Sequence, residues 1–260
     1  LYPDEKILLQ SEYRQKNLKS NHIADFSFFT EKDKDKESKN HFFYNFDKNL
    51  TVGDFDTSEI NFKLQTTSND TYLKSDKIKS VLTNDNNVME NSLDLDLYSN
   101  DLSINLNSTI YEDLNKKNND RYEYILPRLS LVKNFANLAY LNGDFSLESD
   151  TLIRQYNTNI QEKSNINNFI FNSNSKVNDL GFLNNHEFLV KNTNSENKNS
   201  NHKNKKSFYM SGIYQFNSSL PLIKENDNFQ NIFKPRLSFR AAPDHTKDER
   251  KNERKIDITN

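Results

Sequence analysis

The sequence predicts an all-β fold, a segment of an antiparallel transmembrane β-barrel in which about a dozen strands form an open partial barrel. Three observations support this prediction. Apolar and polar residues alternate with the period of a strand, this alternation recurs along the chain, and helical spacing is nowhere sustained. Only 33% of the 260 residues are hydrophobic and 28% are charged. Such a composition fits a barrel, because only the outward side chains of a barrel meet lipid while the inward ones line a wet lumen.

The composition also excludes several kinds of functional site and partner. The chain has no cysteine, which excludes disulfides, thiolate metal sites and a cysteine nucleophile. Its net charge is −2 and its basic residues are scattered among acidic ones, so no nucleic acid is expected as a partner. Asparagine supplies about one residue in six, which codon bias in an AT-rich genome would also produce. The chain lacks an initiating methionine, and we expect an internal piece of a longer protein.

Three strands are expected before residue 50. Residues 7–14 and 22–29 form the first pair, and residues 41–47 alternate again. Residues 30–39 contain no apolar residue, so they are expected to form an exposed, mobile loop. Ala24, Phe26 and Phe28 lie on one face of the second strand, and the alternation in the third strand places Phe42, Tyr44 and Phe46 together.

The alternation is clearest in the first half of residues 58–74 and in a hairpin formed by residues 93–98 and 102–107. Asn100 and Asp101 separate the two arms of the hairpin, and these residue types tolerate the positive φ angles of a tight turn. Residues 83–87 are expected to form a loop. The lipid-facing set includes Ile60, Phe62, Leu64, Leu93, Leu95, Leu97, Leu102, Ile104 and Leu106. The lumen-facing set includes Glu59, Asn61, Lys63, Asp94, Asp96, Asn105 and Asn107.

Further strands are expected in the second half of the chain, separated by polar connections such as residues 192–206, also expected to be mobile. They cover residues 121–132, 140–148, 152–161, 167–176, 182–191, 207–217 and 233–241. Pro127 lacks a backbone donor, so it predicts a bulge or a strand end. A soluble or secreted β-sheet protein would also alternate, and disorder would suit the asparagine-rich stretches, so both alternatives remain open.

Several short sequence words carry a family resemblance. They are S-E-Y-R-Q with Glu12, Tyr13 and Arg14; S-N-D-T-Y-L-K with Asn69, Asp70 and Tyr72; Y-E-D-L at residues 111–114; D-R-Y-E-Y-I-L-P at 120–127; S-L-P-L at 219–222; and K-P-R-L-S-F-R-A-A-P with Pro235, Arg240 and Pro243. In this order they resemble LptD, the lipopolysaccharide-assembly outer-membrane protein or organic solvent tolerance protein family, in its alphaproteobacterial form. The resemblance covers nearly the whole chain.

The resemblance implies a translocon of the cell outer membrane rather than an enzyme. Family members receive lipopolysaccharide through a periplasmic N-terminal domain from a bridge protein of the LptA type, and a plug lipoprotein of the LptE type occupies their large barrel. Residues 1–260 would then be part of a single C-terminal outer-membrane barrel domain, with the periplasmic domain and the remaining strands absent. Lipopolysaccharide, the plug lipoprotein and outer-membrane lipid are the expected partners. A passive outer-membrane pore and a secreted β-sheet adhesin are the alternative functions.

No catalytic residue, cofactor or metal site is expected. The five histidines lack the paired spacing of metal ligands, and each is expected to be an exposed strand or loop residue. Asp94 and Asp96 could poise a general acid, but solvation on a lumen face is the simpler interpretation. Arg128, Arg236 and Arg240 could meet phosphates, and cross-strand pairing with carboxylates is the ordinary alternative.

Two features of the arrangement are also expected. The sheet should be open, with residues 7–14 near one edge and 233–241 near the other, and its free edges should make the isolated piece prone to aggregation. Bacterial barrels place short turns at one end and long loops at the other. The turn at Asn100 and Asp101 should therefore lie at the opposite end from residues 115–119.

Overall fold

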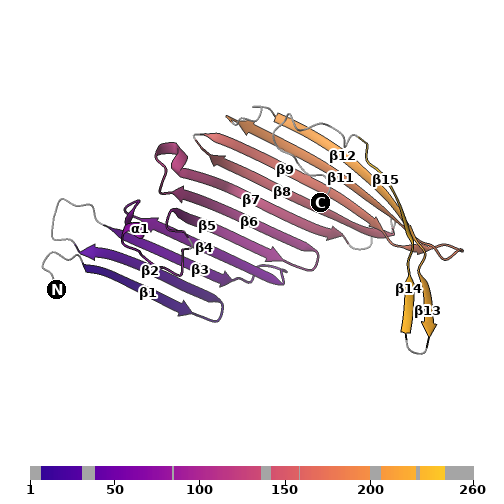
Figure 1. The fold of residues 1–260 in the computed structure, drawn as a ribbon, viewed down its shortest axis with the longest axis horizontal. Coiled ribbons are helices and arrows are strands. Elements are labelled where there is room, and N and C mark those ends of the chain that lie inside the picture. The colour runs from indigo at the N-terminus through magenta and orange to yellow at the C-terminus, as the bar shows by residue number, and fades with distance from the viewer. Residues whose placement is uncertain are drawn as a thin grey trace.

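One large antiparallel sheet dominates the computed structural model, which describes residues 7–30, 39–83, 85–135, 142–157, 159–199, 206–226 and 229–243. Its strands follow one another in space in the order of the sequence (Figure 1). They are β1 (Ile7–Lys16), β2 (Ser20–Thr30), β3 (Asn40–Asn49), β4 (Thr57–Thr67), β5 (Val88–Tyr98), β6 (Leu102–Asp113), β7 (Tyr122–Phe135), β8 (Gly143–Tyr156), β9 (Ile160–Ser173), β11 (Leu183–Lys198), β12 (Lys206–Ser219) and β15 (Arg236–Ala241). The predicted all-β antiparallel architecture is confirmed.

The remaining elements are short. β10 (Lys176–Val177) pairs with β11, while β13 (Leu222–Asn226) and β14 (Phe229–Phe233) form a separate hairpin that extends beyond the sheet (Figure 1). The helical turns are α1 (Tyr72–Ser75) and the 3₁₀ turn η1 (Asn118–Arg121). In the part of the chain that the structure describes, no helix has the length and apolar character needed to span a bilayer.

The sheet is open, as expected. β1 and β15 lie at its opposite edges, and no pairing between the described strands joins them. β15 is shorter than the strand predicted for residues 233–241, because Phe233 ends β14 and Pro235 interrupts the chain before Arg236.

Two predicted boundaries in the second half are wrong. The strands predicted at residues 140–148 and 152–161 are not separate, because β8 runs from Gly143 to Tyr156 across the break between them. Asn157 and Asn159, which have positive φ, follow β8, and β9 begins at Ile160. The predicted connection at residues 192–206 is also wrong in its first half, because β11 continues to Lys198. Residues 192–198 pair with β9 and residues 192–196 also pair with β12, so backbone pairing maintains a strand that lacks an apolar face. Residues 31–38 and 200–205 lie outside the described parts, so the predicted mobility of the two loops remains a prediction.

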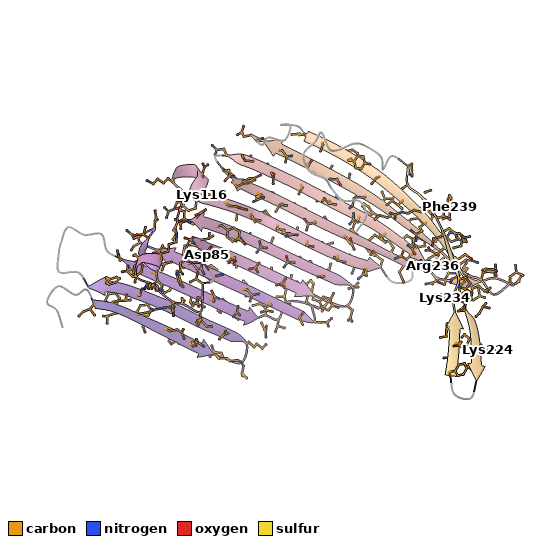
Figure 2. All side chains as sticks on the ribbon, viewed as in Figure 1. Asp85, Lys116, Lys224, Lys234, Arg236 and Phe239 are labelled. Carbon is orange, nitrogen blue, oxygen red and sulfur yellow. The ribbon has the colours of Figure 1, made fainter. Side chains whose placement is uncertain are left out.

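The hairpin at Asn100 and Asp101 is confirmed, since Tyr98 pairs with Ser103. Neither turn residue is among the described residues with positive φ, so that part of the expectation is wrong. The turn lies at the opposite end of β6 from residues 115–119, as predicted. We call these the turn end and the loop end of the sheet. Figure 2 shows Asp85 and Lys116 at the loop end.

The separation of short turns from long loops holds only for the first half of the sheet. The short β8–β9 turn lies at the loop end, and the long connection from β12 to β15 lies at the turn end. That connection contains the β13–β14 hairpin, which continues the register of β12 and β15 past Pro221 and Pro235. The bulge predicted at Pro127 is confirmed, because the pairing of β7 with β8 shifts between Ile125 and Arg128.

The core lies on one side of the sheet and is small. It consists of Phe43, Tyr72, Leu73, Ile78, Leu82, Met89 and Leu114. Four of these residues come from the connection between β4 and β5, residues 68–87, which we call the cover segment. The sheet itself is therefore a single layer over most of its area, with two faces of different character.

Candidate functional site

The first feature of interest is a band of apolar side chains along one face of the sheet. Cross-strand pairing places Leu95 between Ile60 and Leu106, and it pairs Phe62 with Leu93 and Leu97 with Ile104. The predicted lipid-facing set thus shares one face, whereas contact with lipid stays a prediction. Phe62 and Leu93 are 37% and 44% exposed. Rings continue the band over later strands, with centroid distances of 5.5 Å for Phe135–Phe145, 6.1 Å for Phe171–Phe188 and 4.8 Å for Phe188–Tyr214.

The apolar band crosses the strands obliquely. Phe26 on β2 pairs directly with Phe42, yet the centre of the band on β3 is Tyr44, one two-residue step closer to the turn end. The band reaches Phe239 on β15, about ten strand intervals from β2. Over that distance it has moved roughly seven such steps toward the turn end, relative to a line of directly paired residues. With ~3.4 Å per residue and ~4.8 Å between strands, the band makes an angle of about 45° with the strand direction.

The opposite face is polar. It carries the whole predicted lumen-facing set: Glu59, Asn61, Lys63, Asp94, Asp96, Asn105 and Asn107. Lys63 Nζ lies 2.6 Å from Glu90 Oε2, while Asn107 donates to Asp94 and Asn105 donates to Asp96. The two aspartates thus have separate amide partners. Within the described ranges, no group of three or more histidine or acidic side chains could hold a metal ion.

The cover segment packs against this polar face near the loop end. Tyr72 and Leu73 are fully buried. Gln65 Nε2 donates to the Leu82 carbonyl at 2.6 Å, and Gln10 Nε2 donates to the Lys79 carbonyl at 2.9 Å. Sequence reasoning missed this packing, although the apolar residues of an otherwise polar connection were a signal for it.

A buried chain of polar side chains lies beneath Tyr72. The Tyr72 hydroxyl is 2.5 Å from Ser27 Oγ, which is 2.5 Å from His41 Nδ1, and His41 Nε2 is 3.3 Å from Asp25 Oδ1. Asp25, Ser27 and His41 are at most 2% exposed. The expectation that His41 is exposed is therefore wrong, because the cover segment shields it. Burial raises the pKa of the Tyr72 phenol, which keeps it a neutral hydrogen-bonding group.

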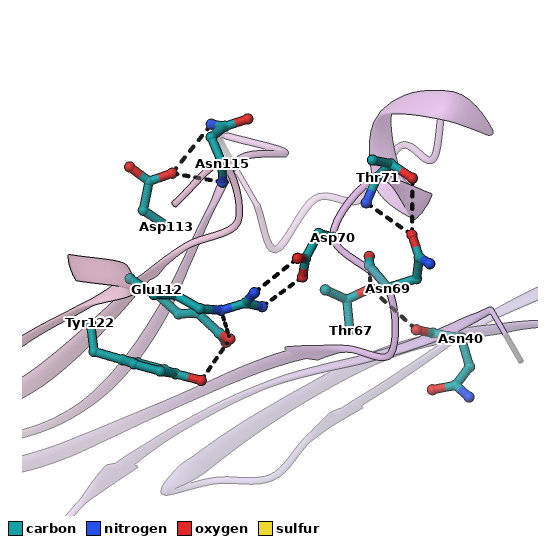
Figure 3. A network of polar contacts seen from close by, with 10 residues as sticks. Asn40, Thr67, Asn69, Asp70, Thr71, Glu112, Asp113, Asn115 and Tyr122 are labelled. Carbon is teal, nitrogen blue, oxygen red and sulfur yellow. Dashed lines mark hydrogen bonds and ion pairs between the residues drawn. The ribbon is translucent and has the colours of Figure 1, made fainter. Parts of the chain in front are cut away.

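An ionic clasp ties the cover segment to the neighbouring loop (Figure 3). The Arg121 guanidinium donates to Asp70 through Nη1 and Nη2, at 2.9 and 2.7 Å, and to Glu112 through Nε at 2.7 Å. The Tyr122 hydroxyl donates to the same Glu112 oxygen at 3.0 Å. Three of the sequence words that carry the family resemblance meet in this clasp.

The clasp predicts a pH-dependent contact. Arg121 holds the pKa of Asp70 below its usual range, so the contribution to stability is present above the ordinary aspartate pKa and is lost as pH falls through the lowered one. Because Asp70 is 45% exposed, we expect about 1 kcal/mol or less. A spin label on Ser75→Cys in this cysteine-free chain should become more mobile below a pH of about 4. Asp70→Asn should abolish that pH step, whereas Asp101→Asn at the turn end should leave it in place.

The remaining residues of the sequence words that carry the family resemblance do not lie together in the structure. Glu12 and Arg14 form an ion pair on β1 beside Tyr13, which is 52% exposed. Asn69 Oδ1 accepts from the Thr71 backbone N–H at 3.0 Å, just before α1. Pro235 precedes β15, while Arg240 and Pro243 are exposed near its end.

Carboxylate pairing of the three singled-out arginines is confirmed only in part. Arg128 lies 3.6 Å from Asp150 on the neighbouring strand. For Arg236, which lies near the sheet end that meets the β13–β14 hairpin (Figure 2), and for Arg240, the described residues show no ion pair. No protein-family model and no curated protein matches this chain.

Proposed function

We propose that this chain is a barrel segment of an outer-membrane translocon that inserts lipopolysaccharide into the outer leaflet. The observation that carries the membrane part is the oblique apolar band. Transmembrane strands are tilted by about 35–45°, so a flat bilayer requires their apolar residues to drift from strand to strand. The drift of about 45° between Phe26 and Phe239 matches that requirement. A soluble sheet has no reason to keep its apolar residues in such a band.

The transport part of the proposal rests on the family resemblance and on the polar face. Glu59, Lys63, Asp94 and Asp96 would line a wet lumen, which suits the passage of a sugar chain. The proposed partners are lipopolysaccharide, outer-membrane lipid, a plug lipoprotein of the LptE type and, through a periplasmic domain, a bridge protein of the LptA type. The open sheet fits a segment of a larger ring, because barrel diameter grows with strand number.

Photo-crosslinking in cells tests this function. A photoreactive amino acid at Asn105, on the polar face of the full-length protein, is expected to form an adduct with lipopolysaccharide. At Ile104, on the apolar face of the same strand, it is expected to form adducts with membrane lipid. A passive pore would give the lipid adducts without the lipopolysaccharide adduct, and a secreted adhesin would give neither and would be released by carbonate washing.

A further inference from the structure

Four asparagines form a ring of hydrogen bonds on the apolar face of the sheet. Asn165 and Asn167 lie on β9, and Asn192 and Asn194 lie opposite them on β11. Asn167 Nδ2 donates to Asn165 Oδ1 at 2.6 Å and to Asn192 Oδ1 at 3.3 Å. Asn194 Nδ2 donates to Asn192 Oδ1 at 2.7 Å and to Asn165 Oδ1 at 3.4 Å. We call these four side chains the amide quartet.

The amide quartet borders the apolar band on its loop-end side. The next cross-strand pairs along β9 and β11 are Phe169 with Val190 and Phe171 with Phe188, which belong to the band. At a tilt of about 45°, each two-residue step along a strand changes the depth by ~5 Å, so the quartet lies roughly 5 to 13 Å from the centre of the band. In the proposed membrane location, this is hydrocarbon depth within one leaflet.

Amides at that depth are costly unless they are hydrogen-bonded. The ring satisfies most of the four side chains, and neighbouring hydroxyls on β8 add to it, since Asn165 donates to Thr151 and Ser149 donates to Asn167. The ring does not use Asn192 Nδ2 or Asn194 Oδ1. Asn192 therefore offers a further amide donor group and Asn194 a further acceptor, which lipid tails cannot satisfy.

Exposed apolar side chains stand beside the quartet. Met210 and Phe208 on β12 pair directly with Asn192 and Asn194, and they are 59% and 70% exposed. A donor and an acceptor on one patch are self-complementary, because a two-fold axis brings the donor of each copy to the acceptor of the other. Flat apolar side chains around such a pair would exclude lipid from it.

We propose that the amide quartet is the contact surface through which a second copy of this chain binds side by side in the membrane. The contact pairs Asn192 of each copy with Asn194 of the other, and Met210 and Phe208 pack around these bonds. This inference rests on the membrane location proposed above.

Single cysteines introduced into residues 1–260, which contain none of their own, test the contact in the full-length protein in native membranes. Met210→Cys is expected to give a disulfide-linked dimer under mild oxidation, whereas Leu95→Cys, on the same face but distant along the sheet, should not. Adding Asn192→Leu and Asn194→Leu to Met210→Cys should abolish the dimer while the protein still folds, because leucine suits lipid at these positions.

A lipid-dissolved quencher of a fluorophore on each cysteine separates the outcomes. The contact is supported if position 210 is shielded while position 95 is quenched. Equal quenching at both positions, without a dimer, would overturn the contact and leave the membrane location standing. A label at position 95 that the quencher cannot reach would overturn the membrane location itself, and this inference with it.

Discussion

Tyr72→Ala is expected to release the cover segment from the sheet and to cost about 3 to 5 kcal/mol of unfolding free energy. Tyr72 is fully buried and belongs to the small core that joins the cover segment to β3. Removing its ring leaves a cavity against Phe29, whose ring centroid is 5.7 Å from that of Tyr72. It also removes the hydroxyl that contacts Ser27, which leaves the buried Ser27, His41 and Asp25 in a poorly shielded site.

Urea unfolding of the refolded full-length protein in lipid vesicles measures the cost, and protease cleavage within residues 68–87 measures the release. Tyr72→Phe keeps the ring and loses one hydrogen bond, so its cost should be about 1 kcal/mol. Tyr98→Ala is the matched control, because Tyr98 is 52% exposed at the turn end. If Tyr72→Ala were no more damaging than Tyr98→Ala, the cover segment would not depend on its core.

Leu95→Arg is expected to destabilise the inserted protein by about 2 to 4 kcal/mol. Leu95 lies between Ile60 and Leu106 in the middle of the apolar band. In the proposed membrane location, a guanidinium there would have to enter the bilayer near its midplane. Asp96→Arg, one residue away, should be tolerated. Its side chain stands on the polar face beside Asn105, where a charge remains in contact with water.

The two arginine variants are compared by their insertion yield and their urea midpoint in vesicles. Their matched positions cancel any general effect of arginine on β5, so the difference reports which face meets lipid. Equal damage at both positions would contradict the assignment of faces. A soluble sheet would show a smaller penalty at Leu95, because the new side chain would extend into water.

The match between sequence and structure is closest where the alternation is clean. β4, β5 and β6 have the predicted faces, because the side chains of an extended strand alternate whatever its neighbours are. The match fails where neither face is apolar. Residues 192–198 contain no apolar residue to mark a strand, and residues 152–161 contain a turn whose asparagines resemble those of the strands around it.

The sequence by itself determined the all-β fold, the two faces of the first strands and the bulge at Pro127, since these follow from local geometry. Only the tertiary structure decided how the cover segment packs, which made His41 a buried residue and brought Asp70 to Arg121. The amide quartet likewise needed the register of β9 against β11. Strand pairing and the docking of a connection join residues far apart in the chain, and a one-residue change of register would move every side chain to the opposite face. Local alternation cannot choose among registers where both faces are polar.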